Sequence, residues 1–548
     1  MLSYRKLAMR VLGRPLHTGG SDSPRPASQR AAALILTAAM LTTLTAPAFA
    51  KEWYIEEGDI TVRAGETEGT NKVSQGENPE VEDTNTVITN SDKDKASSNT
   101  VTIEAKDKDD KVEVTLKDVN IDTSSRSEAA VSVTGEGNTN IELDGDNALK
   151  SDIYRSGIYG SGSLTISGGE NDSLTAQGGS GADGIYSSGS LTISGGTVTA
   201  NGGSGGGGDG GDGIWSSGGV TISGGSTVTA NGGDGKDDYG GDGIRSDSGD
   251  VTISGGSTVT ANGGNGGNVS GDGIRSDSGD VTISGGTVKA AGGDSKDGYG
   301  GDGIRSGGVT ISGGTVNAAG GNGGKVGGYG ICSFARVAIS GGTVNAAGGN
   351  GKNSNGGSDG IISNDIDLSG SLELTAKAGR PNGKAISWAG HELDLDTIKD
   401  KLGPGAKVTA TDANGETKQV SIPRPVEPEK PVIPEESSSS SDGGSATPSA
   451  PASPLPGLTV TDKDGQRISY TSTQSGNALT VCVGRLTASL RASLSTLHQL
   501  RAEGIETITF QTILCSTTLS VDELLAMGGE DAEAVLTHRL TASSLTVG

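Results

Sequence analysis

The chain has 548 residues, of which 95 are glycine and only 3% are aromatic, and its formal net charge is −25. Large aliphatic and aromatic side chains usually fill the interior of a big domain, so this composition argues against one large globular core. Nucleic acids and anionic membranes bind basic surfaces, so the acidic balance disfavours both as partners.

The first 50 residues have the pattern of a secretory signal peptide. Six basic residues precede the apolar run AAALILTAAMLTTLTA, and Ala48-Phe49-Ala50 matches an A-x-A cleavage site. The run is shorter than the ~20 residues of a spanning helix, which disfavours the alternative of an uncleaved membrane anchor. No later segment is apolar enough to span a bilayer. We therefore expect the mature chain to be secreted, at the cell surface or extracellular.

Removal of these residues makes the chain more acidic. Of the 42 Lys and Arg, 36 remain, and of the 67 Asp and Glu, 66 remain, a net charge of −30. Residues 51–85 are polar and acidic apart from WYIEEGDITV. We expect Trp53, Tyr54 and Ile55 to close the N-terminal end of the repeat array that follows.

The central part of the chain is a repeat array. TISGG or a close variant recurs at steps of 27 to 31 residues, and a second marker, usually DGI, recurs in step with it. The clearest Gly-rich repeats occupy 157–376, and 86–156 show the same alternation without glycine pairs. A repeat of this length with small insertions is typical of a solenoid.

Each repeat contains three short runs with a period of two, such as DGIRS, DVTIS and STVTAN. We expect Ile244, Val251, Ile253, Val259 and Ala261 to point inward in one repeat. Gly-Gly pairs and Asp, Asn and Ser clusters separate the runs and suit tight bends. The sequence therefore predicts a mainly β fold, a parallel β-helix over 86–400 with about 28–30 residues per turn. The loop after the third strand varies in length and must lie outside the coil.

The remaining segments are a cap, a linker and a small domain. Residues 401–420 suggest a capping hairpin, and the Pro- and Ser-rich 421–457 a linker. Residues 458–548 suggest a small α+β domain. There Leu486, Leu490, Leu494, Leu497 and Leu500 share one face of a predicted helix that stops at Gly504.

The residue after the DGI isoleucine forms the most informative column. Because the isoleucine points inward, its neighbour should point outward. The column contains Tyr159, Tyr186, Trp215, Arg245, Arg275, Arg305, Cys332 and Ile362. Aromatic faces stack on sugar rings and guanidinium groups bind carboxylates, so an acidic polysaccharide would suit this stripe. The alternative is that each arginine pairs with a nearby aspartate, such as Asp242 or Asp247.

A second column consists of carboxylates one repeat apart. It contains Asp183, Asp212, Asp242, Asp272, Asp302 and Asp359. Stacked carboxylates repel unless they are solvated, bond backbone amides, or hold cations between them. Calcium is the cation that such oxygen ligands would favour, and no other cofactor is suggested.

Catalysis and disulfides have weak support. The only histidines after residue 50 are His391, His498 and His538, all outside the array, and Asp237-Asp238 lies in a variable loop. We expect no enzyme, with polysaccharide lyase as the remaining catalytic alternative. Cys482 and Cys515 can form a disulfide after export, which leaves Cys332 free, or all three can be plain small residues.

Three segments carry a family resemblance. WYIEEGDITV, then VTIEAKDKDDKVEVTLKDVNID, then the GSLTISGG repeats resemble exported bacterial carbohydrate-binding domain-containing proteins. The resemblance covers roughly 51–400. It implies a right-handed parallel β-helix, similar to pectate lyases in fold, that binds pectin-like polyuronate or cellulose with calcium. It assigns no binding residue to a position of this chain.

These observations favour a secreted, non-catalytic protein that binds an acidic plant or cell-surface polysaccharide, and we expect it to be a monomer. An adhesin-like stalk without a specific glycan is the second hypothesis, and a lyase the third.

Overall fold

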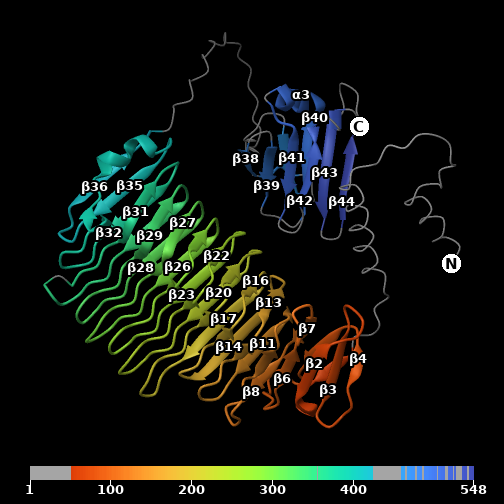
Figure 1. Ribbon diagram of the computed structural model, residues 1–548. Coiled ribbons are helices and arrows are strands. Elements are labelled where there is room, and N and C mark those ends of the chain that lie inside the picture. The colour runs from red at the N-terminus through yellow and green to blue at the C-terminus, as the bar shows by residue number, and fades with distance from the viewer. Residues whose placement is uncertain are drawn as a thin grey trace, which may run out of the picture.

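The chain winds as a long parallel β-helix followed by a small separate set of strands (Figure 1). The computed structural model describes residues 51–354, 356–423 and 458–547, the last range with gaps at 463–465, 469, 476–477, 484–486, 503, 513–515, 522–523, 526–532 and 540–541. The expected signal peptide and most of the expected linker lie outside these residues. No helix in the described ranges is long and apolar enough to cross a membrane.

Each regular turn of the coil contributes one strand to each of three faces. The first face, which carries the DGI strands, contains β2 (Ile60–Ala64), β6 (Val101–Glu104), β9 (Val131–Thr134), β12 (Ile158–Gly160), β15 (Ile185–Ser187), β18 (Ile214–Ser216), β21 (Ile244–Ser246), β24 (Ile274–Ser276) and β33 (Ile386–Trp388). The second face contains β1 (Glu52–Tyr54), β5 (Thr86–Thr89), β7 (Lys111–Lys117), β10 (Asn138–Asp144), β13 (Ser163–Gly168), β16 (Leu191–Ile193), β19 (Val220–Ile222), β22 (Val251–Ile253) and β25 (Val281–Ile283). Three longer strands cross from the first face to the second: β27 (Ile304–Ile311), β29 (Ile331–Ile339) and β31 (Ile361–Leu368).

The third face is a sheet of twelve strands. It contains β8 (Asn120–Asp122), β11 (Asp146–Lys150), β14 (Ser173–Ser180), β17 (Thr197–Gly203), β20 (Thr227–Asn231), β23 (Thr258–Asn262), β26 (Thr287–Ala291), β28 (Thr315–Ala319), β30 (Thr343–Ala347), β32 (Glu373–Lys377), β35 (Lys407–Thr411) and β36 (Thr417–Ser421). All neighbours are parallel except β35 and β36, which form the predicted hairpin at the C-terminal end.

The register places equivalent residues of successive turns directly above one another. Ile244 pairs with Ile274, Val251 with Val281 and Val259 with Val288. All five residues expected to point inward are at most 1% exposed. The interior is therefore a set of aliphatic columns, and the prediction of a mainly β solenoid is confirmed.

The coil begins earlier than 86. Strand β2 already pairs in parallel with β6, so residues 52–64 belong to the first turn. Strands β3 (Asn71–Gln75) and β4 (Val81–Asp83) extend the first face in antiparallel fashion, next to the 3-10 helix η1 (Ile55–Glu57). Trp53 is buried there, and its indole N–H donates to Asp83. At the other end lie β34 (His391–Glu392) and the 3-10 helix η2 (Leu395–Lys401).

The variable loops stack into an ordered ridge outside the coil, visible in Figure 1 as parallel loops along one edge. We call residues 202–211, 232–241, 263–271, 292–301 and 320–328 the loop ridge. Each loop runs out and doubles back, so that a Cβ added to Gly232 on the outgoing arm would collide with the carbonyl oxygen of Gly241 on the returning arm. These glycines are required for close backbone contact, whereas the corner glycines, such as Gly256 with φ +76°, are required for a left-handed turn.

Residues 458–547 form two four-stranded sheets. One contains β37 (Leu458–Thr461), β40 (Ala488–Ser493), β43 (Glu533–Arg539) and β44 (Ala542–Val547), and the other β38 (Thr471–Ser475), β39 (Ala478–Cys482), β41 (Thr507–Gln511) and β42 (Ser516–Ser520). The helix predicted from Leu486 is wrong over its first half. Residues 488–493 alternate small or apolar with polar side chains and pair as a strand, and helix α3 spans only Leu494–Ala502.

Candidate functional site

The aromatic half of the predicted stripe is a stack of rings on the first face. Register places Tyr159, Tyr186 and Trp215 on successive turns. The rings of Tyr159 and Tyr186 lie 5.0 Å apart with an angle of 2°, and those of Tyr186 and Trp215 lie 4.4 Å apart with an angle of 10°. Both faces of Tyr186 are therefore covered by other rings. Only its edge is available to a ligand, so the outward-pointing stripe does not present three open ring faces.

Tyr159 is different because it ends the stack. Its register partner on the preceding turn is Ser132, which has no ring to cover the outer face of Tyr159. Tyr159 is also the most exposed ring of the three, at 43%. The outer face of Tyr159 is thus open at the N-terminal end of the stack, while at the other end Trp215 is followed in register by Arg245.

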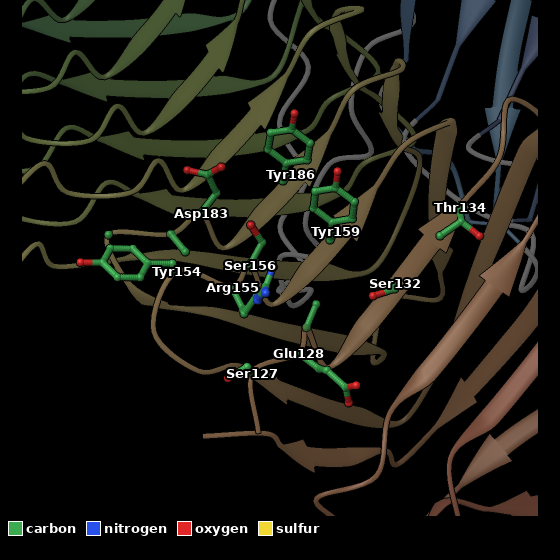
Figure 2. Close-up of a pocket in the computed structure, with 13 residues that line it drawn as sticks. Ser127, Glu128, Ser132, Thr134, Tyr154, Arg155, Ser156, Tyr159, Asp183 and Tyr186 are labelled. Carbon is green, nitrogen blue, oxygen red and sulfur yellow. The ribbon is translucent and has the colours of Figure 1, made fainter. Parts of the chain in front are cut away.

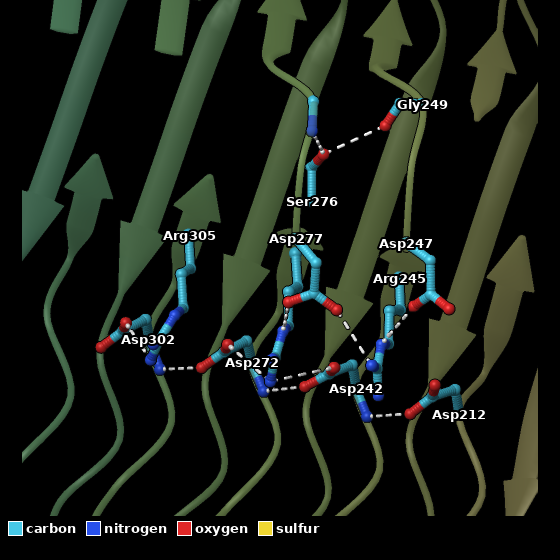
Figure 3. Close-up of polar contacts among 12 residues, drawn as sticks. Asp212, Asp242, Arg245, Asp247, Gly249, Asp272, Ser276, Asp277, Asp302 and Arg305 are labelled. Carbon is cyan, nitrogen blue, oxygen red and sulfur yellow. Dashed lines mark hydrogen bonds and ion pairs between the residues drawn. The ribbon is translucent and has the colours of Figure 1, made fainter. Parts of the chain in front are cut away.

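The arginine half of the stripe is largely paired within the protein (Figure 3). The Arg245 guanidinium lies 3.1 Å from Asp247 and 2.9 Å from Asp277, and Arg275 lies 2.6 Å from Asp277. Arg305 lies 3.6 Å from Asp302 and packs 5.2 Å from the centre of the Phe334 ring. Arg245 and Arg275 therefore follow the alternative stated from the sequence, in which each arginine pairs with nearby aspartates.

The aspartate column forms a continuous ladder of hydrogen bonds beside these arginines. The backbone N–H of each turn donates to Oδ1 of the aspartate on the preceding turn, at 2.6–2.7 Å. The acceptors are Asp183, Asp212, Asp242, Asp272 and Asp302, and Tyr329 donates to the last of them. A sixth member, Asp359, accepts in the same way from the N–H of Lys384. Each carboxylate therefore bonds a backbone amide, one of the three arrangements that the sequence left open.

This ladder is shielded from water. Asp212, Asp242, Asp272 and Asp302 are 4–8% exposed. Burial raises the pKa of Asp242 and Asp272 to about 7 and that of Asp183 and Asp302 to about 6, because the charged form loses its hydration. The pKa of Asp212 is raised well above its usual value for the same reason, and neighbouring carboxylates add to the effect.

The open face of Tyr159 lies at a hollow of about 690 Å³ (Figure 2). The hollow is lined by Tyr154, Tyr159 and Tyr186, by the charged side chains of Glu128, Arg155 and Asp183, and by hydroxyl groups of Ser127, Ser132, Thr134 and Ser156. Aromatic rings mixed with hydrogen-bonding groups in a shallow cleft suit a sugar, which has apolar ring faces and polar edges.

Two residues of this hollow escaped the sequence analysis. Tyr154 is 78% exposed and has a φ of +59°, a conformation that a tyrosine rarely adopts. Arg155 is exposed and makes no ion pair with a described carboxylate, in contrast to Arg245 and Arg275. Glu128, which also lines the hollow, is paired with Arg126 at 2.7 Å. The available signal was the segment DIYRS, in which Ile153, Tyr154 and Arg155 stand together just before the first regular Gly-rich repeat.

The acidic and cysteine residues singled out from the sequence are described next. No group of three or more His, Cys, Asp or Glu side chains is arranged to hold a metal ion in the described ranges. Asp237 and Asp238 are exposed at the tip of the loop ridge. Cys332 is a buried free thiol and Cys482 a half-buried one, while Cys515 lies outside the described residues, so its disulfide stays a prediction.

Comparison with known proteins identifies the type of repeat in the coil. A family model described as beta helix repeat matches residues 220–244, 281–304 and 309–331. The chain contains β-helix repeats. No curated protein and no solved structure matches the chain. Since β-helices occur both in lyases and in proteins without enzymatic activity, the match describes the architecture of these turns.

Proposed function

We propose that the protein is exported and binds an acidic polysaccharide, without cleaving it, at the hollow beside Tyr159. The observation that carries this proposal is an open aromatic face on Tyr159 in the same hollow as Arg155, whose guanidinium makes no ion pair with a carboxylate of the described residues. A sugar ring would stack on Tyr159, and a uronate carboxylate would pair with Arg155 in the bidentate manner that guanidinium groups favour. Export rests on the pattern of the first 50 residues.

The binding test uses the full mature chain and oligogalacturonates, with affinity measured by calorimetry. Arg155→Ala and Tyr159→Ala should each weaken binding about fivefold, since a stacking or ionic contact contributes roughly 1 kcal/mol. Arg275→Ala is the matched control, because its guanidinium is already paired with Asp277. Equal binding by all four proteins would remove the hollow as the site.

The competing structural role has an observation in its favour. The paired Arg245 and Arg275 and the closed ring stack are contacts that stabilise a stalk without any ligand. Binding of no glycan by the intact protein, on an array that includes polyuronates, would favour this adhesin-like stalk. Release of an unsaturated product that absorbs ultraviolet light would instead establish a lyase.

A further inference from the structure

A long polar groove follows the outgoing arms of the loop ridge. Its volume is about 840 Å³, and residues of six successive turns line it, from Ser204 to Lys352. Parallel bridges such as Gly205 to Gly235 and Gly235 to Gly266 stack these arms directly above one another. Because neighbouring turns are about 4.8 Å apart, the groove is about 24 Å long and runs parallel to the coil axis. This shape suits an extended polymer better than a compact small molecule.

Lysines recur on every second turn of this groove. The position after the bridged residues holds Gly206, Lys236, Gly267, Lys296, Gly324 and Lys352 in successive turns. The glycines keep like charges from lying directly opposite one another on neighbouring strands, which would be destabilising. All three lysines are exposed, and none forms an ion pair with a carboxylate of the described residues. Lys352 instead donates from Nζ to the backbone oxygen of Lys296 at 3.4 Å, so its side chain lies along the groove.

The acidic side chains of the ridge do not cancel these charges. The described lining of the groove contains two carboxylates, Asp234 and Asp294. Their Oδ1 atoms accept backbone N–H groups of the next turn, from Asn265 at 2.8 Å and from Asn322 at 2.6 Å. The other exposed aspartates of the same two loops lie nearer the tips and do not line the groove.

The groove becomes more basic toward its C-terminal end. Nδ2 of Asn350 donates to Oδ1 of Asn322 at 3.0 Å, and Asn350 also lines an adjoining hollow of about 380 Å³ with Lys377 and Arg380. Both cations are exposed and without an ion pair to a described carboxylate, and no acid lines this hollow. Groove and hollow together have five cations and two carboxylates, in a chain whose net charge is −25.

The chemistry of the lining distinguishes between kinds of polyanion. Among the described residues, the groove lining contains no aromatic ring, so nucleobases have no surface on which to stack. It contains no aliphatic side chain either, whereas an extended peptide is usually held by pockets for its side chains. The hydroxyl and amide groups of Ser204, Asn265 and Asn322 suit the hydroxyl groups of a sugar. An acidic polysaccharide fits this lining best.

We propose that this groove binds a polyuronate chain parallel to the coil axis. Lys236, Lys296 and Lys352 hold its carboxylates along the groove, and Lys377 and Arg380 hold them at the C-terminal end. The choice of polyuronate rests on the proposed function, whereas the groove and its cations are separate from the hollow at Tyr159. Exposed ion pairs are individually weak and are screened by salt. The groove therefore adds affinity only for chains long enough to contact several turns.

The first test compares a short and a long oligomer, trigalacturonate and dodecagalacturonate, by calorimetry on the full mature chain. Lys236→Ala/Lys296→Ala/Lys352→Ala should weaken binding of the long oligomer about tenfold, because three exposed ion pairs are lost, and leave the short one unchanged. Wild-type affinity of this variant for dodecagalacturonate would overturn the groove and leave the hollow. Arg155→Ala with unchanged binding of trigalacturonate would instead remove the hollow and leave the groove.

A control separates this groove from general attraction of a polyanion to any lysine. It removes the same charge at three exposed lysines outside the groove, in Lys106→Ala/Lys289→Ala/Lys407→Ala. We expect this control to bind dodecagalacturonate like the wild type. An equal loss of affinity in both triple variants would overturn the proposal. The melting curves of both should coincide with that of the wild type, since all the changed side chains are exposed.

Salt and a competitor test the chemistry of the groove. Raising the ionic strength from about 0.05 to about 0.5 M should weaken binding of dodecagalacturonate at least about tenfold, because the exposed charges are screened. Binding of the long oligomer that does not change with salt would contradict an ionic groove. Displacement of dodecagalacturonate by polyglutamate of the same length at equal concentration would overturn the choice of a polysaccharide.

Discussion

The backbone N–H of Asp272 donates a 2.6 Å hydrogen bond to Oδ1 of Asp242 on the preceding turn. Asp242 is 4% exposed, so its carboxylate has exchanged water for this amide and for Arg275, whose Nη1 lies 3.9 Å from Oδ2. One short hydrogen bond and one distant cation do not replace full hydration of a charged group. The ladder therefore stabilises the folded chain when its carboxyl groups are protonated, and it destabilises the folded chain when every member is ionised.

The first prediction concerns pH. The pKa of Asp242 and of Asp272 is about 7 in the folded chain and near 4 in the unfolded chain. Between these values the folded state binds more protons, so stability falls as pH rises from about 4 to 7. Asp59, Asp122 and Asp277 have lowered pKa values, and their contribution is lost only below about pH 4. We expect the melting temperature to be several degrees higher at pH 5.5 than at pH 8.

Its control is the double variant Asp242→Asn/Asp272→Asn. The amide oxygen still accepts the inter-turn N–H, but the side chain no longer titrates. The difference between the melting temperatures at pH 5.5 and pH 8 should shrink in this variant. A wild-type melting temperature that rises from pH 5.5 to pH 8 would contradict the assigned direction of the pKa shifts.

The second prediction concerns Arg275. It is the nearest cation to both Asp242 and Asp272, at 3.9 Å from each. Arg275→Ala should destabilise the chain by about 2 kcal/mol at pH 8, because two buried carboxylates lose their counter-charge, and by less at pH 5.5, where they are protonated. Melting curves at the two pH values measure this difference.

A matched control for that variant is Arg336→Ala. Arg336 also pairs with two aspartates, Asp365 and Asp367, but the three side chains are 28–62% exposed. Its removal should change stability by at most about 1 kcal/mol and equally at both pH values. Similar pH dependence in the two arginine variants would show that the ladder does not depend on Arg275.

The inward columns could be predicted from sequence because they follow from strand alternation alone. Ile244, Val251, Ile253, Val259 and Ala261 have a period of two within each strand, and their period along the chain fixes which residue lies above which. The repeat period likewise predicts that the residues of the stripe and of the aspartate ladder lie above one another. It does not predict their hydrogen-bond partners or exposure, because whether Asp242 contacts water or an amide depends on the path of the bends.

The sequence also could not distinguish two uses of glycine. A Gly-Gly pair suits either a turn with a left-handed backbone or a close contact between two backbone segments. In the loop ridge the glycines serve the close contact. Nor could it show that Tyr186 would be covered on both faces, since a period of one turn predicts proximity and says nothing of ring orientation. The prediction of a long helix through Leu486 and Leu490 was wrong. Over a segment as short as the six residues Ala488–Ser493, the spacing of apolar residues fits a strand as well as one face of a helix.

The third prediction follows from the close contact in the ridge. Gly232→Ala would drive a Cβ into the carbonyl oxygen of Gly241, so the two arms must separate. We expect a loss of about 1–3 kcal/mol and faster proteolytic cleavage within 232–241. Gly207→Ala is the matched control, because a Cβ there meets nothing within 4 Å. If both variants are cleaved at the wild-type rate, the loops do not stack as described.

The fourth prediction concerns calcium, for which the aspartate column was the sequence candidate. Oδ1 of each of Asp183, Asp212, Asp242, Asp272 and Asp302 already accepts a backbone N–H, and arginine nitrogens lie 3.6–3.9 Å from Oδ2 of the last three. Calcium needs six to eight oxygen ligands, and it would have to displace both the amides and the arginines. We therefore expect identical melting curves in calcium and in excess chelator, measured at pH 8 where the carboxylates are most ionised. A lower melting temperature in chelator, abolished by Asp242→Asn/Asp272→Asn, would place the ion in this column.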